Sequence, residues 1–288
     1  MFGTSHTLFR PPGEADSLII RVADGCPWNG CKFCGMYKGV TYRFQGLEYA
    51  EREIHKAWES NENARRIFLA DGDVMYLDFQ TLEKLLISLN ERFPRLARVG
   101  VYANGASILT KTNNELHRLK DLKLNTLYMG LESGDEQVLR EMNKQETAKN
   151  MIEAGQRAQA AGLRMSVMVL IGMAGELRSS EHAKATATVL NEMQPRLLSA
   201  LRLVTTPNTP IYKTFQMITE FEAVTETRGL IANLELEQTV FRADHSSNIV
   251  PLEGRFPKDK QRLLEQLDHL LASGQLDTTS PGRLPWSL

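Results

Sequence analysis

All three cysteines of this chain lie within nine residues, in the stretch CPWNGCKFC from Cys26 to Cys34. A disulfide would pair two of them and leave one thiol over, and this odd count favours a reducing compartment. Thiolates separated by four and then two residues are typical of a metal ion or an iron–sulfur cluster. A structural zinc site would need a fourth ligand, and the nearest downstream histidine, His55, falls in a predicted helix. A [4Fe–4S] cluster held by three thiolates instead keeps one iron open to a ligand.

The cysteine stretch resembles the cluster loop of radical S-adenosylmethionine (radical SAM) enzymes, in which the usual spacing is three and then two residues. The resemblance implies that Cys26, Cys31 and Cys34 hold the cluster, and that the backbone of Phe33 lies near the adenine of SAM. One of four residues must accommodate the extra position in the first spacing: Pro27, Trp28, Asn29 or Gly30. Gly30 can adopt the positive φ that such a bulge needs. A zinc or redox cysteine cluster is the alternative interpretation of the loop.

Charge and hydropathy narrow the class of protein. The chain has 34 basic and 35 acidic residues, a net charge of −1 over 288 residues. No global field therefore recruits nucleic acid or an anionic membrane surface, and a nucleic-acid substrate is unsupported rather than excluded. The N-terminal residues lack the pattern of a secretory signal, and no stretch contains 18 uninterrupted apolar residues. We expect no membrane association and a cytoplasmic location.

Strand and helix patterns alternate along most of the chain. Six apolar runs that end in turn residues predict strands over 17–25, 66–70, 98–103, 126–131, 164–171 and 197–203. Helical patterns lie over 47–60, 78–92, 113–121, 135–142, 146–161 and 180–193. Strands that are apolar on both faces and joined by helices predict an α/β fold with a parallel sheet. This organisation matches the partial (β/α)6 barrel of the radical SAM superfamily.

We expect three segments around this barrel. Residues 1–16 form an extended entry, because the prolines of RPPGEAD disfavour helix. Residues 17–205 form the barrel. Residues 206–288 form an extension that closes it, mainly helical over 210–237 and 257–272 and extended over 240–250.

The carboxyl end of the second predicted strand carries Asp71, Gly72 and Asp73. In α/β barrels the chemistry lies at the carboxyl ends of the strands. Radical SAM enzymes usually have a Gly-Gly-Glu type sequence here, which binds the SAM ammonium group, and Gly-Asp replaces Gly-Glu in this chain. The resemblance therefore implies that Asp73 contacts SAM; a turn-capping aspartate is the alternative.

Polar residues also end the later strands. The resemblance places Glu132, with Ser133, where a carboxylate often binds the ribose hydroxyls of SAM. Asn104 ends the third strand and is a candidate residue for binding SAM. An Asx turn explains it equally well. Gly172, in IGMAGE, resembles the strand end that approaches adenine. Arg202 could pair with the SAM carboxylate, and its alternative is a surface ion pair.

A polar strip, DHSSN from Asp244 to Asn248, lies beyond the predicted barrel between apolar residues. Such a strip could cover the open side of a partial barrel and contact substrate. His245 is the candidate catalytic residue for proton transfer there, although a lone loop histidine is more often structural or solvated.

The resemblance implies an enzyme that binds a [4Fe–4S] cluster and SAM, cleaves SAM reductively and acts on an unidentified substrate. The stretches ADGD, GLESG and HSSN resemble most the branch that includes oxygen-independent coproporphyrinogen oxidase and elongator-type proteins. An electron donor such as flavodoxin or ferredoxin is the implied partner. A non-catalytic iron–sulfur or zinc-binding module and a haem-handling protein on the same fold are the alternatives.

Overall fold

The structure is a computed structural model that describes residues 7–284. The outer ends of the predicted segments 1–16 and 206–288, residues 1–6 and 285–288, lie outside the described residues. Two compact units divide the chain. The first consists of Met1–Asn29, Met36–Met129 and Glu153–Met165, and the second of Gly30–Gly35, Gly130–Ile152 and Ser166–Leu288.

Parallel strands form the centre of the first unit. Their order is β1 (Leu18–Arg21), β4 (Arg66–Ala70), β5 (Arg98–Ala103) and β6 (Leu124–Glu132), whose last three residues belong to the second unit. Apolar residues fill β4, of which only Arg66 is exposed. A strand buried on both faces is what a parallel sheet covered by helices requires.

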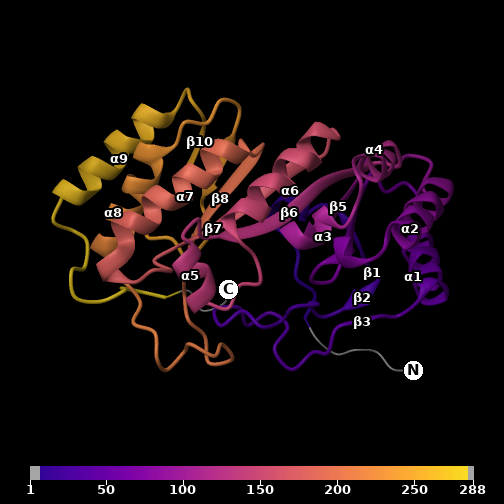
Figure 1. Ribbon diagram of the computed structural model, residues 1–288, viewed down its shortest axis with the longest axis horizontal. Coiled ribbons are helices and arrows are strands. Elements are labelled where there is room, and N and C mark those ends of the chain that lie inside the picture. The colour runs from indigo at the N-terminus through magenta and orange to yellow at the C-terminus, as the bar shows by residue number, and fades with distance from the viewer. Residues whose placement is uncertain (1–6, 285–288) are drawn as a thin grey trace. The chain divides into compact units, whose positions relative to one another are not determined.

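Helices α1 (Leu47–Ser60), α2 (Phe79–Arg92) and α4 (Asn113–Asp121) connect these strands, with the short α3 (Gly105–Leu109) after β5 (Figure 1). Asp78 caps α2: its carboxylate accepts hydrogen bonds from the backbone N–H and the hydroxyl of Thr81, at 2.9 and 2.8 Å. A hairpin of β2 (Ala23–Asp24) and β3 (Arg43–Phe44) flanks the cysteine stretch in the sequence.

The second unit continues with β7 (Arg164–Ile171), β8 (Leu197–Arg202), β9 (Val240–Ala243) and β10 (Leu252–Arg255). β7, β8 and β9 run parallel, and β10 pairs antiparallel with β9. Helices α7 (Ser179–Met193), α8 (Glu220–Asn233) and α9 (Lys260–Ala272) pack side by side on these strands (Figure 1). The shorter α5 (Glu136–Glu141) and α6 (Ala148–Ala160) follow β6.

The α/β class and the mostly parallel sheet are confirmed, and all six predicted strands are present within a sheet of eight. Two local expectations were wrong. The entry segment contains a 3-10 turn, Pro12–Glu14, because a proline at its first position already has the required φ. Helix α8 begins only at Glu220, where Thr219 forms a capping box with Glu222, so residues 210–219 are not helical. The segment 240–250 is extended, as predicted, over its first four residues, which form β9 and pair parallel with β8.

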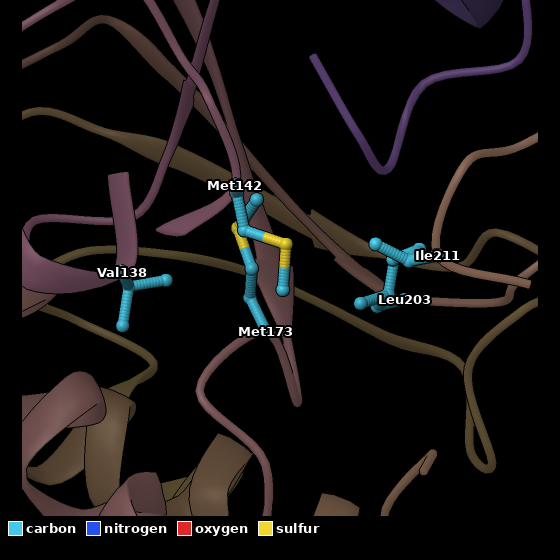
Figure 2. Close-up of a cluster of buried hydrophobic side chains, with 5 residues drawn as sticks. All are labelled: Val138, Met142, Met173, Leu203 and Ile211. Atoms are coloured by element: carbon cyan, nitrogen blue, oxygen red, sulfur yellow. The ribbon is translucent and has the colours of Figure 1, made fainter. Parts of the chain in front are cut away.

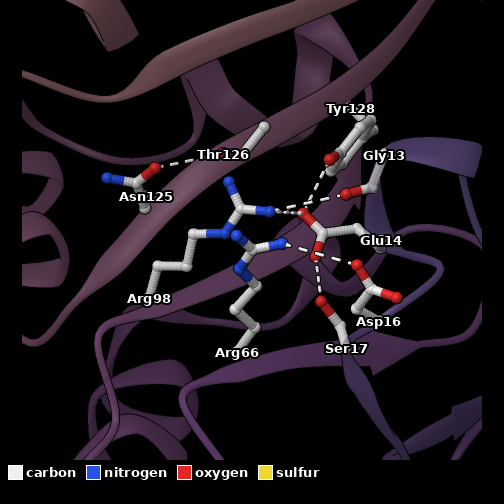
Figure 3. A network of polar contacts seen from close by, with 9 residues as sticks. All are labelled: Gly13, Glu14, Asp16, Ser17, Arg66, Arg98, Asn125, Thr126 and Tyr128. Atoms are coloured by element: carbon white, nitrogen blue, oxygen red, sulfur yellow. Dashed lines mark hydrogen bonds and ion pairs between the residues drawn. The ribbon is translucent and has the colours of Figure 1, made fainter.

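A buried carboxylate fastens the entry segment to the first unit. The side chain of Glu14 is only 1% exposed and accepts hydrogen bonds from the Tyr128 hydroxyl at 2.6 Å, from Arg98 at 3.3 Å and from the Ser17 hydroxyl (Figure 3). Burial, and next the hydrogen bond to Glu14, raise the pKa of Tyr128 above its usual range. Three protein donors therefore satisfy the buried carboxylate.

We predict that Glu14→Ala lowers the free energy of unfolding by about 3 kcal/mol, because it leaves Arg98 and Tyr128 without their buried acceptor. Urea denaturation followed by circular dichroism measures this loss. Asp16→Ala is the matched control from the same segment, because Asp16 is 89% exposed and 4.0 Å from Arg66 (Figure 3). It should change the free energy by less than about 0.5 kcal/mol. Equal losses in both variants would contradict a structural role for Glu14.

Candidate functional site

In the first unit, the loop after β4 packs directly on the start of the cysteine stretch. The backbone N–H of Gly72 donates to the carbonyl of Gly25 at 3.1 Å, and the N–H of Gly25 donates to Asp71 Oδ2 at 3.3 Å. A Cβ on Gly72 would come within 2.5 Å of the Gly25 oxygen and 2.8 Å of the Cys26 Cα. Only glycine fits this approach, which brings Asp71, Gly72 and Cys26 together.

Asp73 is a buried, hydrogen-bonded carboxylate close to this contact in the chain. The residue is 3% exposed, and its Oδ2 accepts hydrogen bonds from Asn104 Nδ2 at 3.0 Å and from Ser107 Oγ at 2.5 Å. Asn104 is also the N-cap of α3, so the turn-forming role considered for it is present together with the contact to Asp73. The structure thus gathers four predicted site residues at the ends of β4 and β5: Asp71, Gly72, Asp73 and Asn104.

Two tyrosines interact with these aspartates, and the sequence analysis missed both. Burial raises the pKa of Tyr37 above its usual range, and the neighbouring Asp71 raises it further. Burial and next the charge of Asp73 raise the pKa of Tyr42 to about 12. Among the residues that the structure describes, the buried Tyr42 hydroxyl has no hydrogen-bond partner. Both tyrosines follow the cysteines by a few residues, but no spacing rule pointed to them.

Asn29 shapes the longer first spacing of the cysteine stretch. It adopts a positive φ of 43°, the conformation that we expected of Gly30, and its Nδ2 donates to the carbonyls of Tyr37 at 2.7 Å and Val40 at 3.2 Å. Asparagine tolerates this conformation better than most residues. The three cysteines are half-buried and form no disulfide. Within residues 7–284 no group of three or more histidine, cysteine or carboxylate side chains is placed to hold a metal ion, so the cysteine ligands stay a prediction.

In the second unit, Phe33 packs against an apolar cluster. One member of the cluster lies in α5, and the others lie in the segments that follow α5, β7 and β8. The cluster consists of Val138, Met142, Met173, Leu203 and Ile211 (Figure 2). The backbone around Phe33 is fastened on both sides: the N–H of Lys32 donates to the Met142 carbonyl and Asn208 Nδ2 donates to the Gly35 carbonyl, both at 2.9 Å. Hydrogen bonds to other segments of the second unit therefore fix the backbone on both sides of Phe33.

Glu132 and Ser133 end β6. Glu132 adopts a positive φ of 64°, and its largely buried carboxylate lies 3.8 Å from Lys144 Nζ. Burial raises the pKa of Glu132, and the charge of Lys144 opposes that rise. The fully buried Ser133 accepts a hydrogen bond from the Asp135 N–H at 3.0 Å. Lys144 was missed because it stands twelve residues further along, after α5.

Gly172 follows β7 with a φ of 85°. A Cβ there would meet Ile218 Cγ1 at 2.9 Å, so glycine is required both by conformation and by space. Its N–H donates to Glu226 Oε1 at 2.7 Å.

Arg202 ends β8 and His245 follows β9, and both contact Ser247. Arg202 is 4% exposed; its Nε donates to the Ser247 carbonyl at 2.8 Å and its NH1 to the Pro281 carbonyl at 2.6 Å. The half-buried His245 accepts a hydrogen bond at Nδ1 from the Ser247 N–H at 3.1 Å, and burial lowers its pKa. Arg202 thus holds two backbone segments rather than a surface ion pair, and a further role toward SAM stays a prediction.

The model of the radical SAM superfamily matches residues 20–184, more than half of the chain. The chain therefore belongs to the radical SAM superfamily, whose members are enzymes that bind a [4Fe–4S] cluster and SAM. A search of curated proteins found no significant match. Within residues 7–284, no helix combines the length and apolar character needed to cross a membrane.

Solved structures of this superfamily share the fold at low sequence identity. HydG, an FeFe-hydrogenase maturase from Carboxydothermus hydrogenoformans, is 20% identical with a TM-score of 0.51, over 86% of this chain and 56% of HydG. Elp3 from Methanocaldococcus infernus is 14% identical with a TM-score of 0.52, over 91% and 64%. Coproporphyrinogen III oxidase (HemN) from Escherichia coli is 15% identical with a TM-score of 0.51, over 89% and 52%. The chain spans little more than half of HydG and HemN.

We predict that Gly72→Ala lowers the free energy of unfolding by about 1 to 3 kcal/mol, because the added methyl group forces the loop away from Gly25 and Cys26. Urea denaturation measures the loss. Gly229→Ala in α8 is the control, since a Cβ there meets only Ala183 Cβ at 3.7 Å, an ordinary contact. If Gly72→Ala proved as stable as the control, the close approach would not constrain the loop.

Proposed function

We propose that this chain is a radical SAM enzyme in which Cys26, Cys31 and Cys34 ligate a [4Fe–4S] cluster and the strand ends bind SAM. The contact of Gly72 with Gly25 carries the proposal, because it attaches the acidic loop to the first of these cysteines. When bound, these cofactors supply reductive cleavage of SAM, with a 5'-deoxyadenosyl radical to abstract hydrogen from substrate. The residues at the site bind, orient and shield the reacting groups.

The buried carboxylate of Asp73 suits the ammonium group of SAM. Its Oδ2 is oriented by the neutral groups of Asn104 and Ser107, and a charge-assisted hydrogen bond from a cationic amine is the strong contact that such a carboxylate can accept. The Tyr42 hydroxyl, buried beside this charge, is a further donor or acceptor for the same ligand. We infer that Asn104 orients Asp73, and that Asp71 holds the loop through Gly25.

Residues of the second unit complete the proposed assignments. The backbone at Gly172 and the backbone of Phe33 are proposed to contact adenine, and Glu132, with Ser133, to bind the ribose hydroxyls. Arg202 is proposed to attract the SAM carboxylate while it holds Ser247 in place. His245 is proposed to exchange a proton with substrate; its lowered pKa favours the neutral imidazole, which can accept one.

The proposal extends to the protein's surroundings. The partners are an unidentified substrate, of small-molecule type in the simplest case, and an electron donor such as flavodoxin or ferredoxin. We propose a cytoplasmic location, consistent with reduced thiols. Residues 17–205 are proposed as the catalytic barrel, which β9 and the segment after it extend.

We predict that protein reconstituted without oxygen carries about four irons per chain, because three thiolates support one [4Fe–4S] cluster. With a strong reductant it should form 5'-deoxyadenosine and methionine from SAM. Serine variants of Cys26, Cys31 and Cys34 should each lose iron and form neither product. Iron analysis and chromatography of the products provide the measurements.

Zinc as the bound metal would contradict the cluster. If cleavage were absent from full-cluster protein, both alone and with added cell extract, it would favour a non-catalytic binding protein. In the same assay His245→Ala should keep the substrate-independent cleavage and lose the part that extract stimulates. Equal loss of both parts would place His245 in folding or SAM binding instead.

We predict that Asp73→Asn weakens SAM binding by about ten- to a hundredfold, since it removes the charge from a charge-assisted hydrogen bond. Iron content should not change. Tyr42→Phe should weaken binding by less, about three- to tenfold, because it removes one neutral hydroxyl. Equilibrium dialysis with labelled SAM measures both, and the exposed Asp16→Asn is the control. Unchanged affinity in Asp73→Asn would leave that residue with a structural role alone.

A further inference from the structure

A fully buried carboxylate lies behind the end of β7. The Glu226 side chain, on α8, is 0% exposed and faces His182 of α7, which is 2% exposed. Its Oε1 accepts hydrogen bonds from the Gly172 N–H at 2.7 Å and from His182 Nδ1 at 2.9 Å, and its Oε2 accepts one from the Ser179 hydroxyl at 2.5 Å. All four residues belong to the second unit. A buried carboxylate is costly unless it is fully hydrogen-bonded, so this arrangement is specific.

The peptide group that joins Ile171 to Gly172 is fixed at both ends. Its N–H donates to Glu226, and its carbonyl accepts a hydrogen bond from the Leu203 N–H at 2.9 Å. The carbonyl of Gly172 itself accepts from the Gly175 N–H at 3.1 Å. The two carbonyls are bound by backbone N–H groups, whereas the N–H of Gly172 is bound by a side chain, that of Glu226 on α8.

Helix α7 carries the groups that orient Glu226. Ser179 begins the helix and His182 stands one turn later. The same helix anchors the end of β6: Thr186 Oγ1 accepts a hydrogen bond from the Gly134 N–H at 3.0 Å, and Arg178 just before it pairs with Asp135. Helix α7 and the residue before it therefore hold the end of β6 directly and the end of β7 through Glu226.

The tautomer of His182 follows from this geometry. Nδ1 must carry a proton to donate to Glu226, and Nε2 is buried without a hydrogen-bond partner among the described residues. His182 therefore acts as a donor at Nδ1 that turns Oε1 toward Gly172.

We propose that Glu226 is a positioning residue for SAM: it holds the Gly172 turn in the conformation that receives adenine, with His182 and Ser179 orienting its carboxylate. The inference rests on the proposed function for the role of Gly172. Glu226 touches no substrate or cofactor in this scheme. It acts only through the backbone, so a side chain that keeps the acceptor at Oε1 should preserve the function even without the charge.

The test compares three variants of the full chain. Glu226→Ala removes the acceptor, and Glu226→Gln keeps one oxygen for Gly172 and His182 while the Ser179 hydroxyl rotates to accept from the amide. Leu230→Ala is the matched stability control, because Leu230 is a buried core residue of the same helix. All three variants are checked for cooperative unfolding.

Hydrogen–deuterium exchange, read by mass spectrometry on peptides that span Gly172, is the first measurement. Glu226→Ala should exchange the Gly172 amide at least tenfold faster, whereas Glu226→Gln and Leu230→Ala should stay within about threefold of wild type, the range expected without loss of a hydrogen bond. This readout needs no SAM and no cluster. Unchanged exchange in Glu226→Ala would overturn the inference.

Binding of SAM and of S-adenosylhomocysteine, measured by equilibrium dialysis, is the second measurement. Glu226→Ala should weaken both by about ten- to a hundredfold, and Glu226→Gln should restore most of the affinity. If wild type bound neither compound, the proposed function would fail rather than this inference. If wild type bound them and Glu226→Ala bound them equally well, or if Leu230→Ala lost as much affinity, the positioning role would be overturned.

Discussion

The absence of a side chain at Gly72 is the constraint on which the first unit's site depends. Because a Cβ there would fall 2.5 Å from the Gly25 oxygen and 2.8 Å from the Cys26 Cα, any larger residue at position 72 would force the loop after β4 away from the start of the cysteine stretch. That approach fixes the positions of the two aspartates on either side of Gly72. Asp71 is fixed by the Gly25 N–H, and Asp73 by donors from the end of β5. A carboxylate pair next to a cysteine is thus a consequence of backbone packing.

Two further buried carboxylates, Glu14 and Glu226, anchor other parts of the scaffold, and each accepts hydrogen bonds from several donors. Glu14 anchors the entry segment on the first unit, where Arg98 supplies a cation and the hydroxyls of Ser17 and Tyr128 complete its shell. Glu226 has a backbone N–H, a hydroxyl and an imidazole instead. An unsatisfied buried charge costs several kcal/mol, about as much as a domain can spare, so each set of donors must persist for the fold to persist.

The sequence predicted the parallel strands well because their signal is local. Apolar runs such as RIFLA end in residues that cannot continue a strand, and β4 spans the same residues as its prediction. Strand β9 was not identified as parallel, since its four residues alternate in burial and its partner, β8, lies some 40 residues earlier. The Glu226–His182 pair is 44 residues apart in the sequence, and no local pattern joins a glutamate of one helix to a histidine of another. The positive φ falls on Asn29 rather than on Gly30, and the Asn29 side chain also donates to two carbonyls, which a glycine cannot do.

The partners of two carboxylates separate their proposed roles. Glu132 lies 3.8 Å from Lys144, so a second cation would compete with an ion pair that already exists, whereas neutral ribose hydroxyls can join it at little electrostatic cost. At Asp73, Oδ2 is held by an amide and a hydroxyl, which orient the carboxylate. Burial lowers the pKa of Lys111, and the charge of Asp73 opposes that lowering, so Asp73 already acts on a buried cation. The neutral donors at Asp73 and the ammonium at Glu132 are the partners that suit the two proposed roles, in which Asp73 binds the ammonium group of SAM and Glu132 binds ribose hydroxyls.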